Sequence, residues 1–201
     1  MQRKKWKNYL LEGTLIVFSV MLALFLNQVV ENIDTYRQKE NAINRITVEL
    51  ERNLNVLENW LEVHDQMRLR TEQIITGEND SLKQQLMDQS FFNLQILTGD
   101  RSFIDSNLSN TAWETAKSTD IVNEFDFETL EKLTDVYTLQ ELVFNHTIQG
   151  ISKIFFERET HNLKNIDATL IQFQLRFSEL VGQERLLIEY YRKVIDGLKQ
   201  K

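Results

Sequence analysis

One apolar segment near the N-terminus differs from the rest of the chain. The run GTLIVFSVMLALFL, from Gly13 to Leu26, contains no charged residue. Extended to Tyr9 and Val30 it covers 22 residues, about 33 Å as an α-helix, which is long enough for a hydrocarbon core of about 30 Å. The pattern therefore predicts a transmembrane helix over residues 9–30.

Beyond that segment, apolar residues recur in a seven-residue rhythm in which spacings of three and four alternate. Such spacing places side chains on one seam of a helix. Glu40, Thr47 and His64 are poor occupants of the seam, and no helix stop precedes Gly77. We expect one continuous helix from the span to about Ile75. Its predicted seam consists of Leu26, Val29, Ile33, Tyr36, Glu40, Ile43, Thr47, Leu50, Leu54, Leu57, Leu61 and His64.

A second long seam lies near the C-terminus. It predicts a helix from about Asn165 to Leu198, in which Gly182 is a weak point and Glu184 is the one poor occupant. The predicted seam consists of Ile166, Leu170, Phe173, Phe177, Leu180, Glu184, Leu187, Tyr191, Val194 and Leu198.

The two seams are too apolar to face water, because burying one Leu or Phe side chain is worth about 1.5–3 kcal/mol. We favour an antiparallel bundle in which the two long helices pack on each other. In that arrangement Leu54 and Phe177 lie in the core, and Leu50 lies close to Phe177. The alternative is a coiled coil between separate chains.

Shorter helices are predicted between the two long ones. Turn residues after Gly77 open a helix over residues 82–97. Thr111 and Glu114 fit a capping box, in which a hydroxyl and a carboxylate satisfy free backbone donors at a helix start. Asp126 is a candidate cap for a further helix that carries apolar residues as far as Phe155.

Composition supports an all-α fold. The chain has no proline, no cysteine and only six glycines, so helices can run long, and disulfides and thiolate metal sites are excluded. The predicted fold class is all-α, with an N-terminal transmembrane helix that continues into an antiparallel helical bundle with two long heptad-patterned helices. The domains are a basic tail at 1–8, the span at 9–30 and an acidic bundle at 31–201.

Charge is distributed unevenly along the chain. The net charge is −7, yet four basic residues precede the span: Arg3, Lys4, Lys5 and Lys7. The positive-inside rule then predicts a cytoplasmic N-terminus and a domain on the opposite, periplasmic side. A cleaved signal peptide is the competing interpretation, but no A-x-A-like site follows the apolar core. The acidic body argues against nucleic-acid binding.

The chain carries no recognisable catalytic or cofactor motif. Glycine-rich phosphate loops, G-x-S-x-G and H-E-x-x-H are all absent from the sequence. Glu157 and His161 are four residues apart and could touch one ion, although such a pair is common by chance. His64, on the apolar seam, is better explained as a core histidine with hydrogen-bond partners. We therefore expect no catalytic residue, no metal site, no cofactor and no enzymatic activity.

Four residues of the span could contact a partner. Glu12 lies at the edge of the apolar run, where a carboxylate must reach the headgroups or pair with another group. Ser19 and Ala23 form a small-xxx-small pair that allows two helices to approach closely. Asn27 closes the apolar run on the far side. These positions predict contacts with a second copy or with another membrane protein.

The span resembles that of an uncharacterised family of short bacterial single-pass membrane proteins. The family pattern is a glutamate at the start and an A-L-x-(I/L)-N motif at the end, and the matching residues are Glu12, Ala23, Leu24, Leu26, Asn27 and Glu31. The stretch 111–118 is similar to a second family region. Ser19, Phe25 and Val29–Val30 depart from the pattern. The resemblance implies a single-pass protein of the inner membrane, without established activity.

Two functional hypotheses remain open from the sequence. The first is a non-catalytic interaction or scaffold protein, anchored in the inner membrane. The second is an extracytoplasmic ligand-binding sensor or accessory module. Because no later segment is apolar enough for a second span, such a sensor would act through a separate membrane partner.

Overall fold

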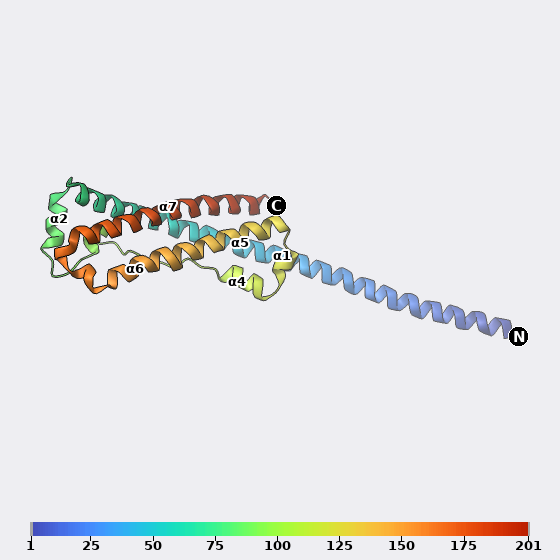
Figure 1. Cartoon of the computed structure of the whole chain (residues 1–201). Helices are drawn as coiled ribbons and strands as arrows, with labels where there is room; N and C mark the ends of the chain where they lie inside the picture. The colour runs from blue at the N-terminus through green and yellow to red at the C-terminus, as the bar shows by residue number, and fades with distance from the viewer. Residues whose placement is uncertain (1, 201) are drawn as a thin grey trace.

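The protein is an all-α bundle from which one long helix projects (Figure 1). The computed structural model describes the backbone of residues 2–200 and the side chains of residues 13–200. Within residues 2–200 there is no strand. The predicted fold class, an N-terminal helix continuing into a helical bundle, is confirmed.

The first helix, α1 (Gln2–Thr76), is 75 residues long, about 112 Å at 1.5 Å per residue. The predicted continuous helix is confirmed, and it ends one residue beyond Ile75. Gly77 follows with a φ of +75°, a left-handed conformation that glycine adopts without steric cost. The helix therefore ends where the sequence places its stop.

The last helix, α7 (Ile166–Lys199), also agrees closely with its prediction. It runs without interruption through Gly182, so the expected weak point is wrong. Every predicted seam residue is buried except Leu198, which is half-buried. Glu184, the apparent exception on this seam, is fully buried.

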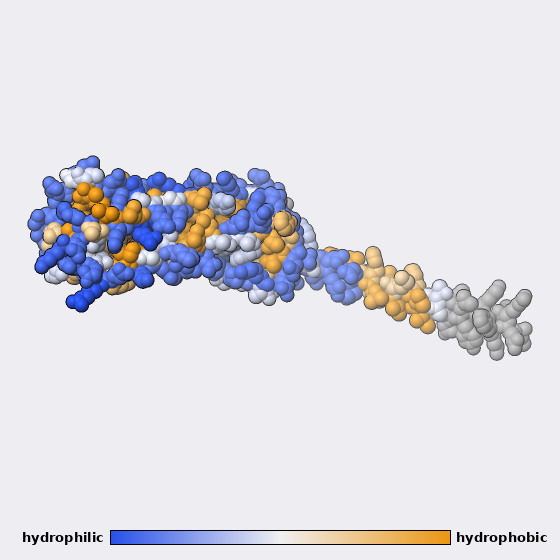
Figure 2. Space-filling view, viewed as in Figure 1, coloured by the Kyte–Doolittle hydropathy of each residue, from blue (hydrophilic) through white to orange (hydrophobic). Residues whose placement is uncertain are grey.

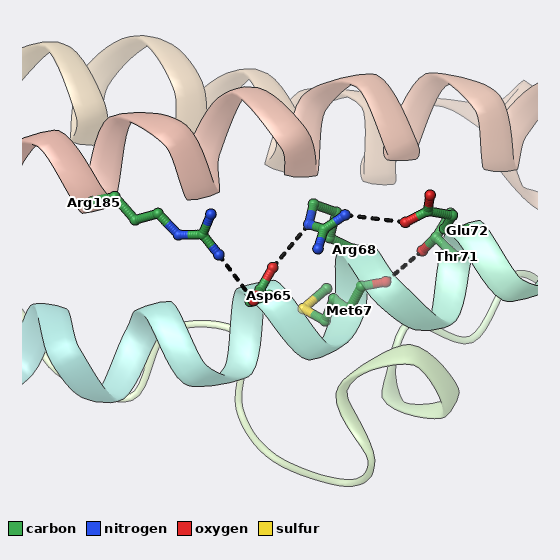
Figure 3. A network of polar contacts seen from close by, with 6 residues as sticks. All are labelled: Asp65, Met67, Arg68, Thr71, Glu72 and Arg185. Carbon is green, nitrogen blue, oxygen red and sulfur yellow. Dashed lines mark hydrogen bonds and ion pairs between the residues drawn. The ribbon is translucent and has the colours of Figure 1, made fainter.

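The helices α1 and α7 pack antiparallel, and ion pairs spaced one heptad apart join them. Figure 3 shows one of these pairs, in which Arg185 of α7 binds Asp65 of α1, beside the Arg68–Glu72 pair within α1. The three pairs between the helices are Glu51–Lys199 at 2.6 Å, Glu58–Arg192 at 2.6 Å and Asp65–Arg185 at 3.1 Å.

These ion pairs correct the predicted register. They place Leu50 opposite the C-terminal end of α7, so its expected proximity to Phe177 is wrong. The heptad rhythm repeats every seven residues, and several registers bury the same apolar seam. The register present in the structure is the one in which the ion pairs join Glu51 to Lys199, Glu58 to Arg192 and Asp65 to Arg185.

The buried seam of α1 also differs from the predicted one. Thr47, Leu50, Leu57 and His64 are buried as predicted, but Leu54 and Leu61 are only half-buried at its flank. Asn53 and Trp60 are buried in place of their neighbours Leu54 and Leu61, because Asn53 bonds to the Ser109 carbonyl and the Trp60 indole donates to Asp105. The buried seam consists of Ile46, Leu50, Asn53, Leu57, Trp60, His64, Met67, Thr71 and Ile74.

The predicted helix over 82–97 is wrong. The structure has α2 (Asp80–Met87), an irregular segment and the single turn α3 (Gln95–Thr98). Phe92, in the irregular segment, is fully buried and stacks on Phe173 of α7 with ring centroids 5.0 Å apart. The chain leaves the helical path because burial of this aromatic ring outweighs the lost helical turns.

A third rod covers the pair of long helices. It consists of α5 (Phe127–Leu142), a π-helical turn η2 (Val143–Ile148) and α6 (Gln149–Phe156). The predicted cap at Asp126 is confirmed, since its carboxylate accepts a hydrogen bond from the Thr129 amide at 2.9 Å. Phe127 is an exception on the predicted apolar face, because it is exposed.

Short elements complete the bundle. The helix α4 (Thr111–Ser118) and the 3-10 turn η1 (Ile121–Glu124) lie at the end of the bundle from which α1 projects, and α2 lies at the opposite end (Figure 1). Two further 3-10 turns, η3 (Arg158–His161) and η4 (Leu163–Asn165), connect α6 to α7. We call the first end the base and the second the distal end.

Candidate functional site

The apolar N-terminal part of α1 makes no contact with the bundle. Every residue from Gly13 to Asp34 is exposed, and Figure 2 shows apolar residues along the projecting helix. By length and composition this helix could cross a membrane. Glu12 lies outside the residues whose side chains the structure describes.

Three of the predicted contact residues share one face of α1. Ser19, Ala23 and Asn27 are spaced by four and all are exposed. The Ser19 hydroxyl donates to the carbonyl of Leu15 at 2.8 Å, and the Asn27 amide donates to the Glu31 carboxylate at 2.7 Å. The polar groups of this face are thus satisfied within α1, and the small side chains leave the helix surface open to a neighbour.

Within the bundle, His64 on the seam of α1 faces Glu184 on the seam of α7. His64 Nδ1 lies 2.6 Å from Glu184 Oε1, and both side chains are fully buried. His64 Nε2 lies 2.8 Å from the carbonyl oxygen of Phe103. The interpretation of His64 as a core histidine with partners is confirmed.

The carbonyl of Phe103 fixes the protonation of this pair. A carbonyl only accepts, so Nε2 carries a proton, and one further proton lies between Nδ1 and Oε1. Burial raises the pKa of Glu184, which favours the neutral acid donating to Nδ1. The pair thus avoids placing a net charge in the core.

A second buried polar group, Glu49 of α1, organises the base. Its Oε2 accepts from the Ser109 hydroxyl at 2.7 Å and from the Ala112 amide at 2.9 Å. Its Oε1 accepts from the Tyr137 hydroxyl at 2.7 Å. A carboxylate at the start of α4 also complements the positive end of that helix. Glu49 therefore joins α1, α4 and α5.

The predicted capping box of Thr111 and Glu114 is wrong. The cap residue is Asn110, whose side chain makes no capping bond, and Thr111 is already helical. Glu114 instead pairs with Lys117 at 2.7 Å. The carboxylate acceptor comes from Glu49, 63 residues earlier in the chain, so a local motif could not reveal it.

Asn53, one turn after Glu49, extends the polar core. Its side-chain amide makes two hydrogen bonds to the backbone of Ser109. The Nδ2 group donates to the Ser109 carbonyl at 2.6 Å, and Oδ1 accepts from the Ser109 backbone N–H at 2.9 Å. The Gln140 side chain accepts from Asn53 at 3.3 Å and also from the Tyr191 hydroxyl. This network links α7 to the loop that precedes α4.

Burial sets the protonation of both tyrosines in the polar core. It is the largest cause that raises the pKa of Tyr137, and the Glu49 carboxylate raises it further. Burial also raises the pKa of Tyr191. Both hydroxyls therefore remain protonated donors at neutral pH. In the polar core the Tyr137 hydroxyl donates to Glu49 and the Tyr191 hydroxyl donates to Gln140.

Two open grooves flank α4. The α4–α5 groove has a volume of about 760 Å³ and the α1–α4 groove about 770 Å³. Trp113 lines the first and stacks on Tyr137, with ring centroids 5.5 Å apart. Amide side chains surround this aromatic pair: Asn107, Asn110, Gln140 and Asn145.

The π-helical turn η2 shapes the wall of the α4–α5 groove. It contributes Phe144 and Asn145 to the lining. Thr147, in the same turn, donates to Gln183 of α7 at 2.6 Å. Such turns occur frequently at functional sites, since the extra residue changes the direction of side chains. The sequence offered no signal for this irregularity.

Glu157 and His161, whose spacing of four residues could bring both to one ion, do not have the predicted geometry. Glu157 ends α6 in an extended conformation and His161 belongs to η3, so the two do not lie on one helix. The His161 ring packs against Phe155 and Phe91, at centroid distances of 5.4 and 6.1 Å. No group of three or more His, Asp or Glu that could hold a metal ion occurs among residues 13–200.

Comparison with protein-family models, with curated proteins and with solved structures finds no match to this chain.

Proposed function

We propose that the protein is a non-catalytic interaction or scaffold protein anchored in the bacterial inner membrane by the N-terminal part of α1. The basic tail would lie in the cytoplasm and the bundle in the periplasm. The carrying observation is that the apolar stretch after Gly13 is fully exposed yet continuous with a well-packed bundle. An apolar helix of this length without a protein cover needs lipid around it. The resemblance of the span to short bacterial membrane proteins supports the same proposal.

The proposed partners are the lipid bilayer and either a second copy of the chain or another membrane protein. The face that contains Ser19, Ala23 and Asn27 is the proposed contact within the membrane, with Glu12 at its cytoplasmic end. Small side chains there permit close helix approach. The net charge of −7 disfavours nucleic acid as a partner.

Topology is tested by fusing reporters after the last residue of the full chain. Alkaline phosphatase should be active and green fluorescent protein exported by the Sec route should be dark. An inactive phosphatase together with a bright fluorescent fusion would reverse the proposed orientation. Extraction of the membranes at high pH should leave the full chain in the pellet, and release into the supernatant would contradict anchoring.

The partner face is tested with single cysteines, which the chain otherwise lacks. Ala23→Cys should give an oxidative crosslink in native membranes, to a second copy or to a cysteine-containing partner. Met21→Cys, about 200° around the helix, is the matched control and should give none. Equal crosslinking at both positions, or none at either, would contradict the proposed face.

A second candidate function is a ligand-binding sensor or accessory module that acts through a separate membrane partner. The α4–α5 groove favours it, because an indole ring and several amides converge there, which suits a small polar ligand. A panel of amino acids and sugars should include a compound that raises the melting temperature of the full chain. Asn145→Leu should abolish that shift, and Gln38→Leu, in the other groove, should not.

A further inference from the structure

Two exposed phenylalanines mark the two ends of the α5–η2–α6 rod. Phe127 begins α5 and Phe156 ends α6, and each side chain is 79% exposed. Full burial of a phenylalanine side chain is worth about 1.5–3 kcal/mol, so such exposure is costly without a cover. The start of α5 and the end of α6, where these two residues lie, are at opposite ends of the bundle (Figure 1).

The position of Phe127 relative to the proposed span follows from α1. Glu124, three residues before Phe127, lines a hollow with Asn32, Thr35, Tyr36 and Lys39 of α1. These residues follow the end of the span at Val30 by two to nine positions, about 3–14 Å along the helix. A headgroup layer is about 5–8 Å thick on each side. The part of this hollow nearest the span therefore lies at headgroup level, and the base of the bundle begins there.

The direction of α5 aims Phe127 at the membrane. In an α-helix the Cα–Cβ bonds tilt towards the N-terminus, and the N-terminus of α5 lies at the base (Figure 1). Phe127 therefore projects away from the bundle on the side of the span. Phe156 ends a helix that runs towards the distal end, so the same tilt directs it back along the bundle.

We propose that the base of the bundle rests on the lipid headgroups, with Phe127 inserted into the interface as a second membrane contact beside the span. This inference rests on the proposed membrane anchoring. Tyr36 of α1, 62% exposed, would lie at the same level, where aromatic side chains are enriched.

The surrounding charges favour contact through the aromatic ring and not through anionic lipid. Asp126 is engaged in capping α5, and the Glu128 carboxylate pairs with Lys132. Glu124 lines the same hollow as Lys39, so charges of both signs lie there and neither sign dominates the interaction with the headgroups. We therefore expect the insertion of Phe127 in uncharged phosphatidylcholine bilayers as well as in bilayers containing phosphatidylglycerol.

Nitroxide labels on single cysteines test the inference, using the full chain in phosphatidylcholine nanodiscs. Collision with a water-soluble nickel chelate should be several-fold lower for Phe127→Cys than for Phe156→Cys, the matched control. Val20→Cys, in the middle of the span, reports anchoring and should be still less accessible to nickel. If Val20→Cys is protected and Phe127→Cys equals Phe156→Cys, this inference fails and the anchor stands. If Val20→Cys is accessible, the proposed anchoring fails.

A nitroxide at position 127 replaces the phenylalanine and can itself enter the bilayer. A second experiment therefore tests the Phe127 side chain directly. For this purpose the nitroxide is placed at Glu124→Cys and Phe127 is kept. Nickel access at position 124 should rise about two-fold or more when Phe127→Ser is added, since an exposed side chain can change without unfolding the bundle. Unchanged access would overturn the role of Phe127.

Discussion

The two halves of the bundle core are built in different ways. In the distal half, Phe173 stacks between Phe92 and Phe177, with ring centroids 5.0 and 5.4 Å away. In the half next to the base, Asn53 on the seam of α1 and Glu49 beside the seam are buried and hold hydrogen bonds to other elements. Both halves bury apolar side chains, and the basal half adds directional polar contacts from Glu49 and Asn53.

This difference has a consequence for specificity. Apolar surfaces can pack in several registers, whereas a buried carboxylate or amide must meet its own partners or bear the cost of desolvation. Glu49 and Asn53 therefore fix where α4 and its preceding loop lie. The two open grooves flank α4, so the polar half positions the part of the bundle best shaped for recognition.

The largest expected effect comes from the distal half. Phe173→Ala should destabilise the protein by about 3–5 kcal/mol, because it removes a fully buried ring between two others. Denaturant unfolding of the full chain in nanodiscs measures the change. Phe156→Ala, at an exposed position, should change stability by less than about 0.5 kcal/mol. Similar losses in both variants would contradict the proposed stacking core.

A smaller and more local effect is expected in the basal half. Glu49→Ala should cost about 2–3 kcal/mol, since the Ser109, Ala112 and Tyr137 donors lose a charged acceptor. Hydrogen exchange should accelerate in α4 and remain unchanged near Phe173. Glu51→Ala, half-exposed on the same helix, is the control. Equal acceleration in both halves would remove the distinction between them.

The buried His64–Glu184 pair, which lies between the two halves, should make the free energy of unfolding depend on pH. Burial raises the pKa of Glu184 above its ordinary value of 4.5, so the folded pair keeps its shared proton, whereas an unfolded chain with an ordinary glutamate and an ordinary histidine loses the last proton of the two groups above about pH 6.5. The contribution of this pair to stability should therefore decrease as pH rises above about 6.5, by at most about 1.4 kcal/mol per pH unit. Glu184→Gln, which can still donate to His64, should lack this component. A stability difference between parent and variant that grows in favour of the parent as pH rises would contradict a neutral pair.

The smallest effect concerns the ion pairs that run along both halves. A double-mutant cycle on Glu58→Arg and Arg192→Glu should give a favourable coupling of about 0.2–1 kcal/mol, as expected for exposed charges. Reversal of both charges together should restore most of the loss of the single variants. Coupling of Glu58 to a different base of α7 would mean another register.

Sequence reasoning identified the two long helices because their rhythm extends over many turns. The register could not be read from the charges, since Glu72 continues the spacing of Glu58 and Asp65 and a shift of one heptad would pair these three acids with the same three bases of α7. The basal polar core was harder to predict. Asn53 and His64 look unsuitable on an apolar seam until their distant partners are known, and Phe92 leaves its helix for a contact with Phe173. Contacts between residues far apart in the chain decided each of these cases.

The unbroken course of α1 has a mechanical consequence. No glycine or proline occurs between Gly13 and Gly77, so the helix has no hinge where it enters the bundle. The helix α1 is therefore stiff, and α7 packs along its C-terminal half. If the N-terminal part of α1 is held in a bilayer, a rotation of the helix about its axis turns both grooves about the membrane normal by the same angle. A rotation by the angle between two successive residues is about 100°. A neighbour that binds the Ser19–Ala23 face would thereby fix the direction, parallel to the membrane plane, in which α4 faces.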